Sequence, residues 1–292
     1  MQRIVLTVLA LTLNFSVVVS ESSGQDKPAT PAEQYKALFK EYDGTSGSGV
    51  PMSDAERLQF IGRAYKQRFA LGAKLLELAE RYPDDPIALE ALTQAVWQVN
   101  TTPWPVELVG EDTARAPALE LIQRRHIHSD TLGPLCQRVS YGFCKEYEDF
   151  LRAVLTQNPH RDVQATACLS LGHFLKNRMQ RIELYREQPD EARDFAGLFG
   201  EQYIAQLLQQ DGDTAIKEAE AVFELAAEKY GGITLSDGDI VAKRADMELF
   251  EIRSLRVGKE APDIEGLDQD GKRFTLSEYR GKVVLLDFWS YV

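Results

Sequence analysis

Apolar residues with helical spacing run through most of this chain, from Ser53 to about Leu255. Between positions 69 and 79 they recur about every three to four residues, so they share one broad helix face. Ser53 and Glu56 have the spacing of a capping box, which predicts that a helix begins at this point. We therefore predict a mostly α-helical domain over residues 31–255.

Three turns divide this helical domain into similar units. They are Tyr82–Pro86, Asn158–His160 and Gly231–Gly232, and each separates two segments of helical spacing. The format resembles helical-repeat scaffolds of the tetratricopeptide kind, although their strict consensus is absent. An irregular helical bundle explains the pattern equally well. The expected helical segments are 31–42, 69–79, 87–99, 150–155, 163–175, 221–230 and about 237–255.

Residues 1–20 have the properties of a secretory signal peptide. A basic start at Arg3 is followed by an apolar run and by small residues ahead of Glu21, where cleavage is expected. An uncleaved membrane anchor is the alternative, which the short run and its polar Asn14 disfavour. We expect residues 21–30 to be a linker. We also expect an exported protein, periplasmic or otherwise extracytoplasmic and of the bacterial type.

Charge and aromatic residues restrict what the chain can bind. The net charge is −12 at pH 7, and such an acidic surface repels the phosphate backbone of nucleic acids. Trp97 and Trp104 lie close to two prolines and could line a groove, but we predict that they pack in the core. The partner expected for the helical domain is a protein.

The chain contains three cysteines, Cys136, Cys144 and Cys168, and no Cys-x-x-Cys pair. Export implies an oxidising compartment, in which Cys136 and Cys144 could form a disulfide across a small loop. The other interpretation is that all three are small buried apolar residues. His126 and His128 precede these cysteines and are weak candidates for metal ligands. We predict no metal site and no cofactor.

At Val257 the sequence pattern changes. Pro262 excludes a helix interior, and Asp270-Gly271 between polar and apolar arms predicts a β-hairpin. Residues 275–281 are expected to form one helical turn that ends at a glycine. Residues 283–289 are continuously apolar and β-rich except for Asp287, which predicts a strand buried on both faces within an α/β sheet.

Residues 257–292 resemble the opening part of the redoxin and TlpA-like thiol–disulfide oxidoreductases. The resemblance implies an incomplete thioredoxin-like α/β domain after the helical domain, and a protein disulfide or dithiol as the partner. Peroxiredoxins, which are antioxidant enzymes, share this opening, but Trp289-Ser290 stands where they usually have proline. The matching elements are Gly258, Ala261-Pro262-Asp263, Asp270-Gly271-Lys272, Leu276-Ser277, Arg280-Gly281-Lys282-Val283-Val284 and Leu286-Asp287-Phe288-Trp289.

In this family the Phe-Trp element is followed by Cys-x-x-Cys at the start of a helix. The helix N-terminus stabilises a thiolate, which attacks the substrate disulfide. The resemblance places the first of these cysteines immediately after Val292, so the sequence contains no catalytic residue of the family. We therefore expect a truncated and inactive redox domain. The alternative is a non-enzymatic helical scaffold that binds protein and carries a vestigial redox segment.

This expectation has a structural consequence for residues 283–288. The neighbours of a central strand would be missing on one side, and a segment of this length cannot bury the strand alone. The strand should then either dock on the helical domain or remain an exposed apolar edge that is prone to pairing between chains.

Overall fold

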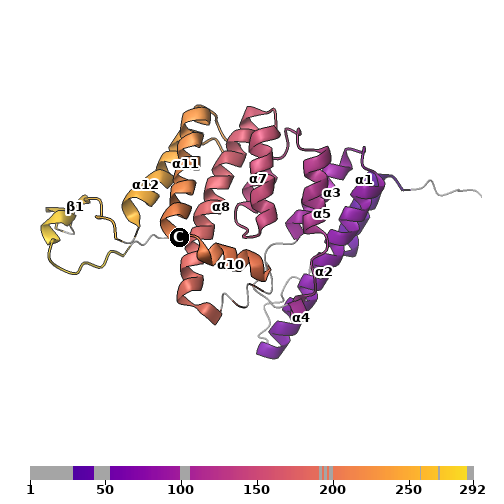
Figure 1. The fold of residues 1–292 in the computed structure, drawn as a ribbon, viewed down its shortest axis with the longest axis horizontal. Helices are drawn as coiled ribbons and strands as arrows, with labels where there is room; N and C mark the ends of the chain where they lie inside the picture. The colour runs from indigo at the N-terminus through magenta and orange to yellow at the C-terminus, as the bar shows by residue number, and fades with distance from the viewer. Residues whose placement is uncertain are drawn as a thin grey trace, which may run out of the picture.

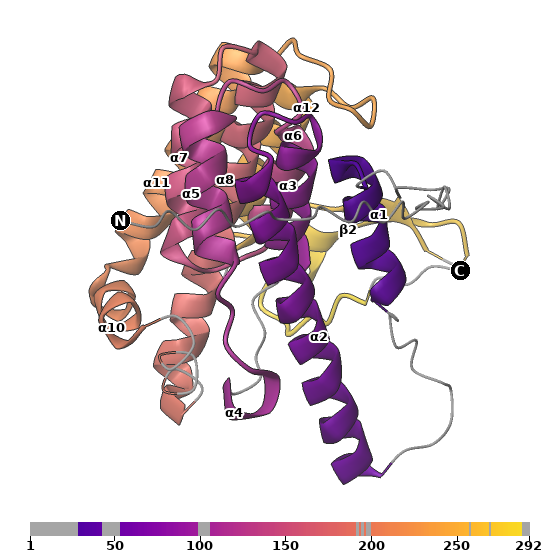
Figure 2. The same cartoon turned by 90° about the vertical axis from the view of Figure 1, so that its right-hand side faces the viewer.

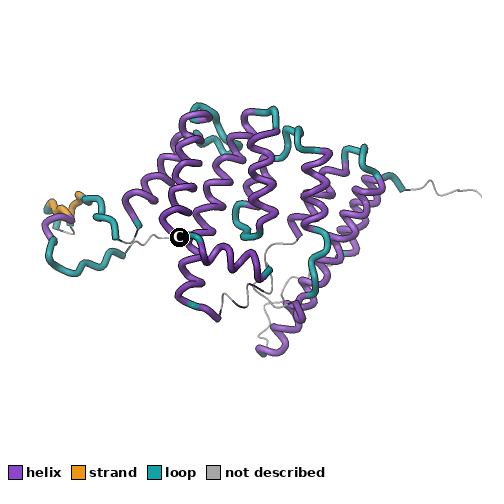
Figure 3. Tube along the Cα trace, viewed as in Figure 1, coloured by secondary structure: helices purple, strands orange, loops and turns teal. Residues whose placement is uncertain are grey.

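The computed structural model describes residues 29–42, 53–98, 106–190, 193, 196, 200–256, 258–268 and 270–287. Most of these residues are α-helical, as predicted, and the two short strands both lie near the C-terminal end (Figure 3). The signal peptide predicted for residues 1–20, most of the predicted linker and Trp104 lie outside the described residues. None of the described helices is long and apolar enough to cross a membrane.

The long helices pack side by side in a row from α1 to α12, and α10 lies across the row beside α8 (Figure 1). Figure 2 shows the N-terminal part of α2 projecting beyond its neighbours, and residues 53–59 there are exposed. The helices are α1 Pro31–Glu41, α2 Asp54–Arg81, α3 Ile87–Gln98, α4 Val106–Val109, α5 Arg115–Arg125, α6 Gly133–Val139, α7 Lys145–Gln157, α8 Arg161–Glu187, α10 Glu201–Gln209, α11 Gly212–Tyr230 and α12 Val241–Phe250. A π-helical turn, η1 Glu251–Leu255, extends α12.

Capping side chains fix the starts of the first two long helices. Ser53 accepts a hydrogen bond from the backbone N–H of Glu56, whose carboxylate accepts one from the N–H of Ser53, which confirms the predicted capping box. Thr30 and Glu33 cap α1 in the same reciprocal way. Thr30 is therefore part of the first helix cap, and not of the linker predicted for residues 21–30.

Each of the three predicted turns joins two helices into a hairpin, namely α2–α3, α7–α8 and α11–α12. In the second turn, the side chain of Asn158 is only 1% exposed. Its amide nitrogen donates to the carbonyls of Ile127 and Ser129, both at 2.7 Å, and its oxygen accepts from the N–H of His160 at 2.9 Å. This turn residue therefore also attaches the loop after α5 to the α7–α8 hairpin.

A single large hydrophobic core runs through the row from α2 to α12. On the predicted face of residues 69–79, Leu76 is partly buried and the other large apolar side chains are buried together with Ala79, namely Phe69, Leu71, Leu75 and Leu78. At Gly172 on α8 the ring of Phe223 on α11 comes so close that an added Cβ would lie 2.6 Å from it. Close contact between α8 and α11 therefore requires glycine at this position.

The helices α3, α6, α8 and α12 lie against one another along one side of the row. α3, α8 and α12 are the second helices of the three hairpins, and α6 packs against both α3 and α8. Because hairpin follows hairpin, residues far apart in the sequence meet on this side of the molecule.

After η1 the chain forms a small antiparallel hairpin of β1 Glu265–Leu267 and β2 Arg273–Thr275. Gly271 has φ +76°, a conformation that favours glycine, and Asp268 closes the turn by accepting from the N–H of Lys272 at 2.8 Å. A 3₁₀ turn, η2 Leu276–Tyr279, follows and ends ahead of Gly281. The predicted hairpin and helical turn are thus confirmed.

The buried central strand predicted for residues 283–289 is wrong for its described part, residues 283–287. This part belongs to no strand, and its side chains are exposed, with Val283 at 103% and Leu285 at 92%. The described residues of this region form a sheet of two strands, which cannot cover both faces of a third. The apolar segment therefore stays exposed, as in the second of the two expected outcomes, but its described residues do not form the strand edge that this outcome assumed.

Candidate functional site

A cavity of about 430 Å³ opens on the side formed by α3, α6, α8 and α12. We call this cavity the groove. Its size lies within the range of ligand-binding pockets. Its walls come from α3, α6 with the two residues after it, α8, the turn between α11 and α12, and α12 itself. The lining residues are Trp97, Pro134, Gln137, Arg138, Ser140, Tyr141, Thr166, Leu169, Ser170, His173, Leu235, Asp237 and Arg244.

Trp97 and Arg138 form one wall of the groove. The guanidinium carbon of Arg138 lies 5.2 Å from the centre of the Trp97 ring, within the range of a cation–π interaction. The prediction that Trp97 packs in the core is wrong, since it is 39% exposed. It lies in the last turn of α3 and lines the groove, whereas Ala95 and Val96 of the same turn are buried in the core.

Ion pairs hold the opposite wall. Arg244 on α12 pairs with Asp237 and, at 3.4 Å, with Asp239 in the preceding turn. His173 on α8 lies 3.0 Å from Glu248 on α12. The hydrogen bond from His173, together with the nearby Lys176, holds the pKa of Glu248 at about 2, below its ordinary value of 4.5. These contacts fix the position of α12 relative to α8.

Arg138 differs from Arg244 because no described carboxylate lies within ion-pair distance of it. Its Nε atom is buried and has no hydrogen-bond partner among the residues that the structure describes. The groove is thus lined by two arginines and one aspartate, and the charge of Arg244 is already balanced. This local excess of positive charge lies on a chain whose net charge is −12.

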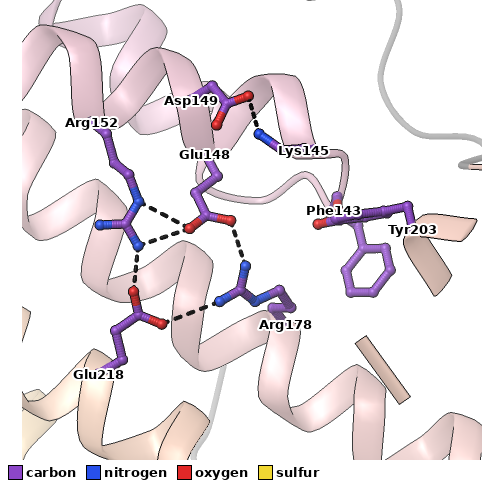
Figure 4. Close-up of polar contacts among 8 residues, drawn as sticks. All are labelled: Phe143, Lys145, Glu148, Asp149, Arg152, Arg178, Tyr203 and Glu218. Carbon is purple, nitrogen blue, oxygen red and sulfur yellow. Dashed lines mark hydrogen bonds and ion pairs between the residues drawn. The ribbon is translucent and has the colours of Figure 1, made fainter. Parts of the chain in front are cut away.

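A second group of charges joins α7, α8 and α11 (Figure 4). Arg178, 4% exposed, pairs with Glu148 and also, at 3.4 Å, with Glu218. Arg152 binds Glu148 through two hydrogen bonds of 3.0 and 2.8 Å and pairs with Glu218 as well. Each of these four residues has partners within the network, so we interpret the network as structural.

The three cysteines are free and buried, which agrees with the second interpretation of the sequence. Burial raises the pKa of both Cys144 and Cys168 to about 12, and it also raises the pKa of Cys136. At neutral pH these thiols are therefore protonated and shielded. They cannot act as the nucleophile of thiol–disulfide exchange.

His126 and His128 do not form a metal site with the cysteines. Across the described residues, no group of three or more histidine, cysteine, aspartate or glutamate side chains has the geometry to hold a metal ion. His126 follows α5 and is half-buried, and both its burial and the charge of Arg125 lower its pKa. Its Nε2 atom is buried without a described hydrogen-bond partner, whereas His128 is exposed.

Comparison of the chain with protein-family models, curated proteins and solved structures found no match. The candidate site therefore depends on geometry alone. Sequence reasoning missed Arg138, Tyr141, His173 and Arg244, because none of them belongs to a motif. Only Trp97, near two prolines, gave a signal for a groove in the sequence, and core packing was the predicted alternative.

Proposed function

We propose that residues 258–287 belong to a thioredoxin-like domain, and that the protein is an exported thiol–disulfide oxidoreductase with a helical N-terminal domain. The observation that carries this proposal is the order of structural elements after η1. A hairpin, a single helical turn and an exposed apolar segment follow one another at the residues that resemble the redoxin family.

The contacts within this segment support the proposal. The N–H of Ser277 donates to the carboxylate of Asp263 at 2.8 Å, and the N–H of Leu276 donates to the carbonyl of Ile264 at 2.9 Å. The first contact joins two of the matching elements, Ala261-Pro262-Asp263 and Leu276-Ser277, and the second joins Leu276 to the residue directly after Asp263. The exposed Val283 and Leu285 have the apolar character that a larger sheet would bury.

Reading the gene beyond the codon for Val292 tests this proposal directly, since residues 1–292 contain no Cys-x-x-Cys. We expect an in-frame Cys-x-x-Cys at the start of the continuation, and its absence would refute the proposal. The protein made from the whole reading frame should reduce insulin disulfides, and replacement of its first added cysteine by serine should abolish the activity. The chain that ends at Val292 is the control, and we expect no turnover from it because its three thiols are buried.

The groove supports a second candidate function, a protein-binding scaffold in the helical domain. Tryptophan, tyrosine and arginine contribute most to many protein interfaces, and Trp97, Tyr141 and Arg138 all line this groove. This candidate does not depend on the redox proposal. It would be the better description of the chain if no Cys-x-x-Cys follows Val292 and a peptide nevertheless binds the groove.

A further inference from the structure

We propose that the groove binds a short extended peptide segment in which an acidic residue stands next to an apolar one. This inference deepens the scaffold function named above and does not depend on the redox proposal. Three properties of the groove carry it: an unbalanced guanidinium, two accessible aromatic rings and an unpaired amide side chain. Each property selects one part of the ligand.

The unbalanced guanidinium selects a carboxylate. No described acidic side chain neutralises Arg138, and the Trp97 ring lies 5.2 Å from its guanidinium carbon. Arginine can donate two parallel hydrogen bonds to a carboxylate, which a lysine or a neutral side chain cannot do. Arg244, by contrast, is paired with Asp237 and Asp239. It lines the groove, but its charge is already neutralised.

The aromatic rings select an apolar neighbour of that carboxylate. Tyr141 is 68% exposed and Trp97 is 39% exposed, so both rings can lose further contact with water when a ligand binds. Burial of apolar area contributes about 25 cal/mol for each Å² removed from water. Trp97 would therefore contact both the guanidinium and the apolar side chain beside the bound carboxylate.

The unpaired amide and the shape of the site favour a peptide over an isolated small acid. Gln137 lines the groove, and its side chain has no hydrogen-bond partner among the described residues. An amide can donate and accept at once, as a peptide backbone requires. The walls come from α6 and from helices of three successive hairpins, and such stacked helices present elongated surfaces that suit extended segments.

Fluorescence anisotropy with three labelled hexapeptides tests the proposal on the chain of residues 1–292. The peptides alternate leucine with glutamate, glutamine or lysine and have amidated C-termini. We expect the glutamate peptide to bind at least about tenfold more tightly than the other two. Its affinity should also fall as the salt concentration rises.

Variants connect this binding to the groove. We expect Arg138→Gln to weaken binding of the glutamate peptide by about tenfold and to remove the preference over the glutamine peptide. Tyr141→Ala should weaken all three peptides, and its exposure keeps this change from disturbing the core. Arg63→Gln is the matched control, because Arg63 is an exposed arginine of α2 that does not line the groove. Arg63→Gln should not change the affinity for any of the three peptides.

Several results would overturn the inference. Equal binding of the glutamate and glutamine peptides would show that Arg138 selects no carboxylate. The same loss in Arg63→Gln as in Arg138→Gln would place binding outside the groove. Phenylacetate that displaces the glutamate peptide at equal concentration would identify a small-acid site. If about 1 mM protein does not change the anisotropy of the glutamate peptide, its dissociation constant lies above about 1 mM and the groove does not bind it appreciably. None of these results depends on whether Cys-x-x-Cys follows Val292, so this inference and the redox proposal can fail separately.

Discussion

The buried ion-pair network between α7, α8 and α11 allows a stability prediction to be worked out in detail. Arg178 is 4% exposed, and its charge is balanced by Glu148 and by Glu218 at 3.4 Å. Glu148 is paired twice, because Arg152 also donates two hydrogen bonds to it. Removal of Glu148 therefore leaves Arg178 poorly paired, whereas removal of Arg178 leaves Glu148 well paired (Figure 4).

The two substitutions should consequently have unequal costs. Glu148→Met leaves the buried guanidinium with the longer contact to Glu218, at 3.4 Å, as its remaining ion pair, and breaking a buried pair in this way costs about 3–5 kcal/mol. Arg178→Met leaves Glu148 bound to Arg152 and also removes a charge that was costly to bury. We expect it to cost only about 0–2 kcal/mol. The double variant should be more stable than Glu148→Met alone, since no poorly paired charge stays buried.

Urea unfolding followed by far-ultraviolet circular dichroism measures these differences. Lys145→Met is the control, because the ammonium of Lys145 forms an exposed pair with Asp149 in the same helix and should be worth less than about 1 kcal/mol. Equal losses for Glu148→Met and Arg178→Met would refute the reasoning. A double variant less stable than Glu148→Met would refute it as well.

Three further predictions concern acid stability, packing and thiol accessibility. The pKa of Glu248 in the folded protein, about 2, lies below the ordinary 4.5, so its stabilising effect is complete above about pH 4.5 and is lost as the pH falls toward 2. Glu248→Gln should therefore lower the urea midpoint at pH 7 and flatten its dependence on pH between 4.5 and 2; an unchanged acid profile would contradict this. Gly172→Ala should destabilise the fold by about 1–3 kcal/mol, because the added Cβ meets the buried ring of Phe223, and Phe223→Leu should recover part of that loss in the double variant. A thiol reagent should find no fast-reacting cysteine in the native protein and three in guanidinium chloride, whereas a Cys136–Cys144 disulfide would leave only one.

The local parts of the fold could be predicted because the residues responsible lie close together in the sequence. The capping pair Ser53 and Glu56 is three residues apart, and Asp270-Gly271 lies within the turn that it forms. The three helix-joining turns contain the prolines and glycines that interrupt helical spacing. These residues interrupt a helix wherever they stand, so the turns could be predicted without the distant contacts that Asn158 makes to Ile127 and Ser129.

The predictions that failed depended on distant neighbours. The spacing of residues 283–289 is that of a buried strand, but a strand is buried only when other strands and helices cover it, and the described hairpin does not. Trp97 is apolar and lies in a helix that contributes to the core, yet its side chain lines the groove and stays exposed. The hydrophobicity of a residue alone could not show whether its side chain is buried in the core or exposed.

The sequence by itself determined the helical domain, its three hairpin turns, the small β-hairpin and the absence of a Cys-x-x-Cys, since each follows from adjacent residues. Only the tertiary structure decided that Arg138 and Trp97 meet across two helices, that Arg178 is neutralised from both sides, and that the three cysteines are shielded. These outcomes depend on which faces of non-adjacent helices come together. Which faces meet depends on the packing of the whole core, and the residues of that core are far apart in the sequence.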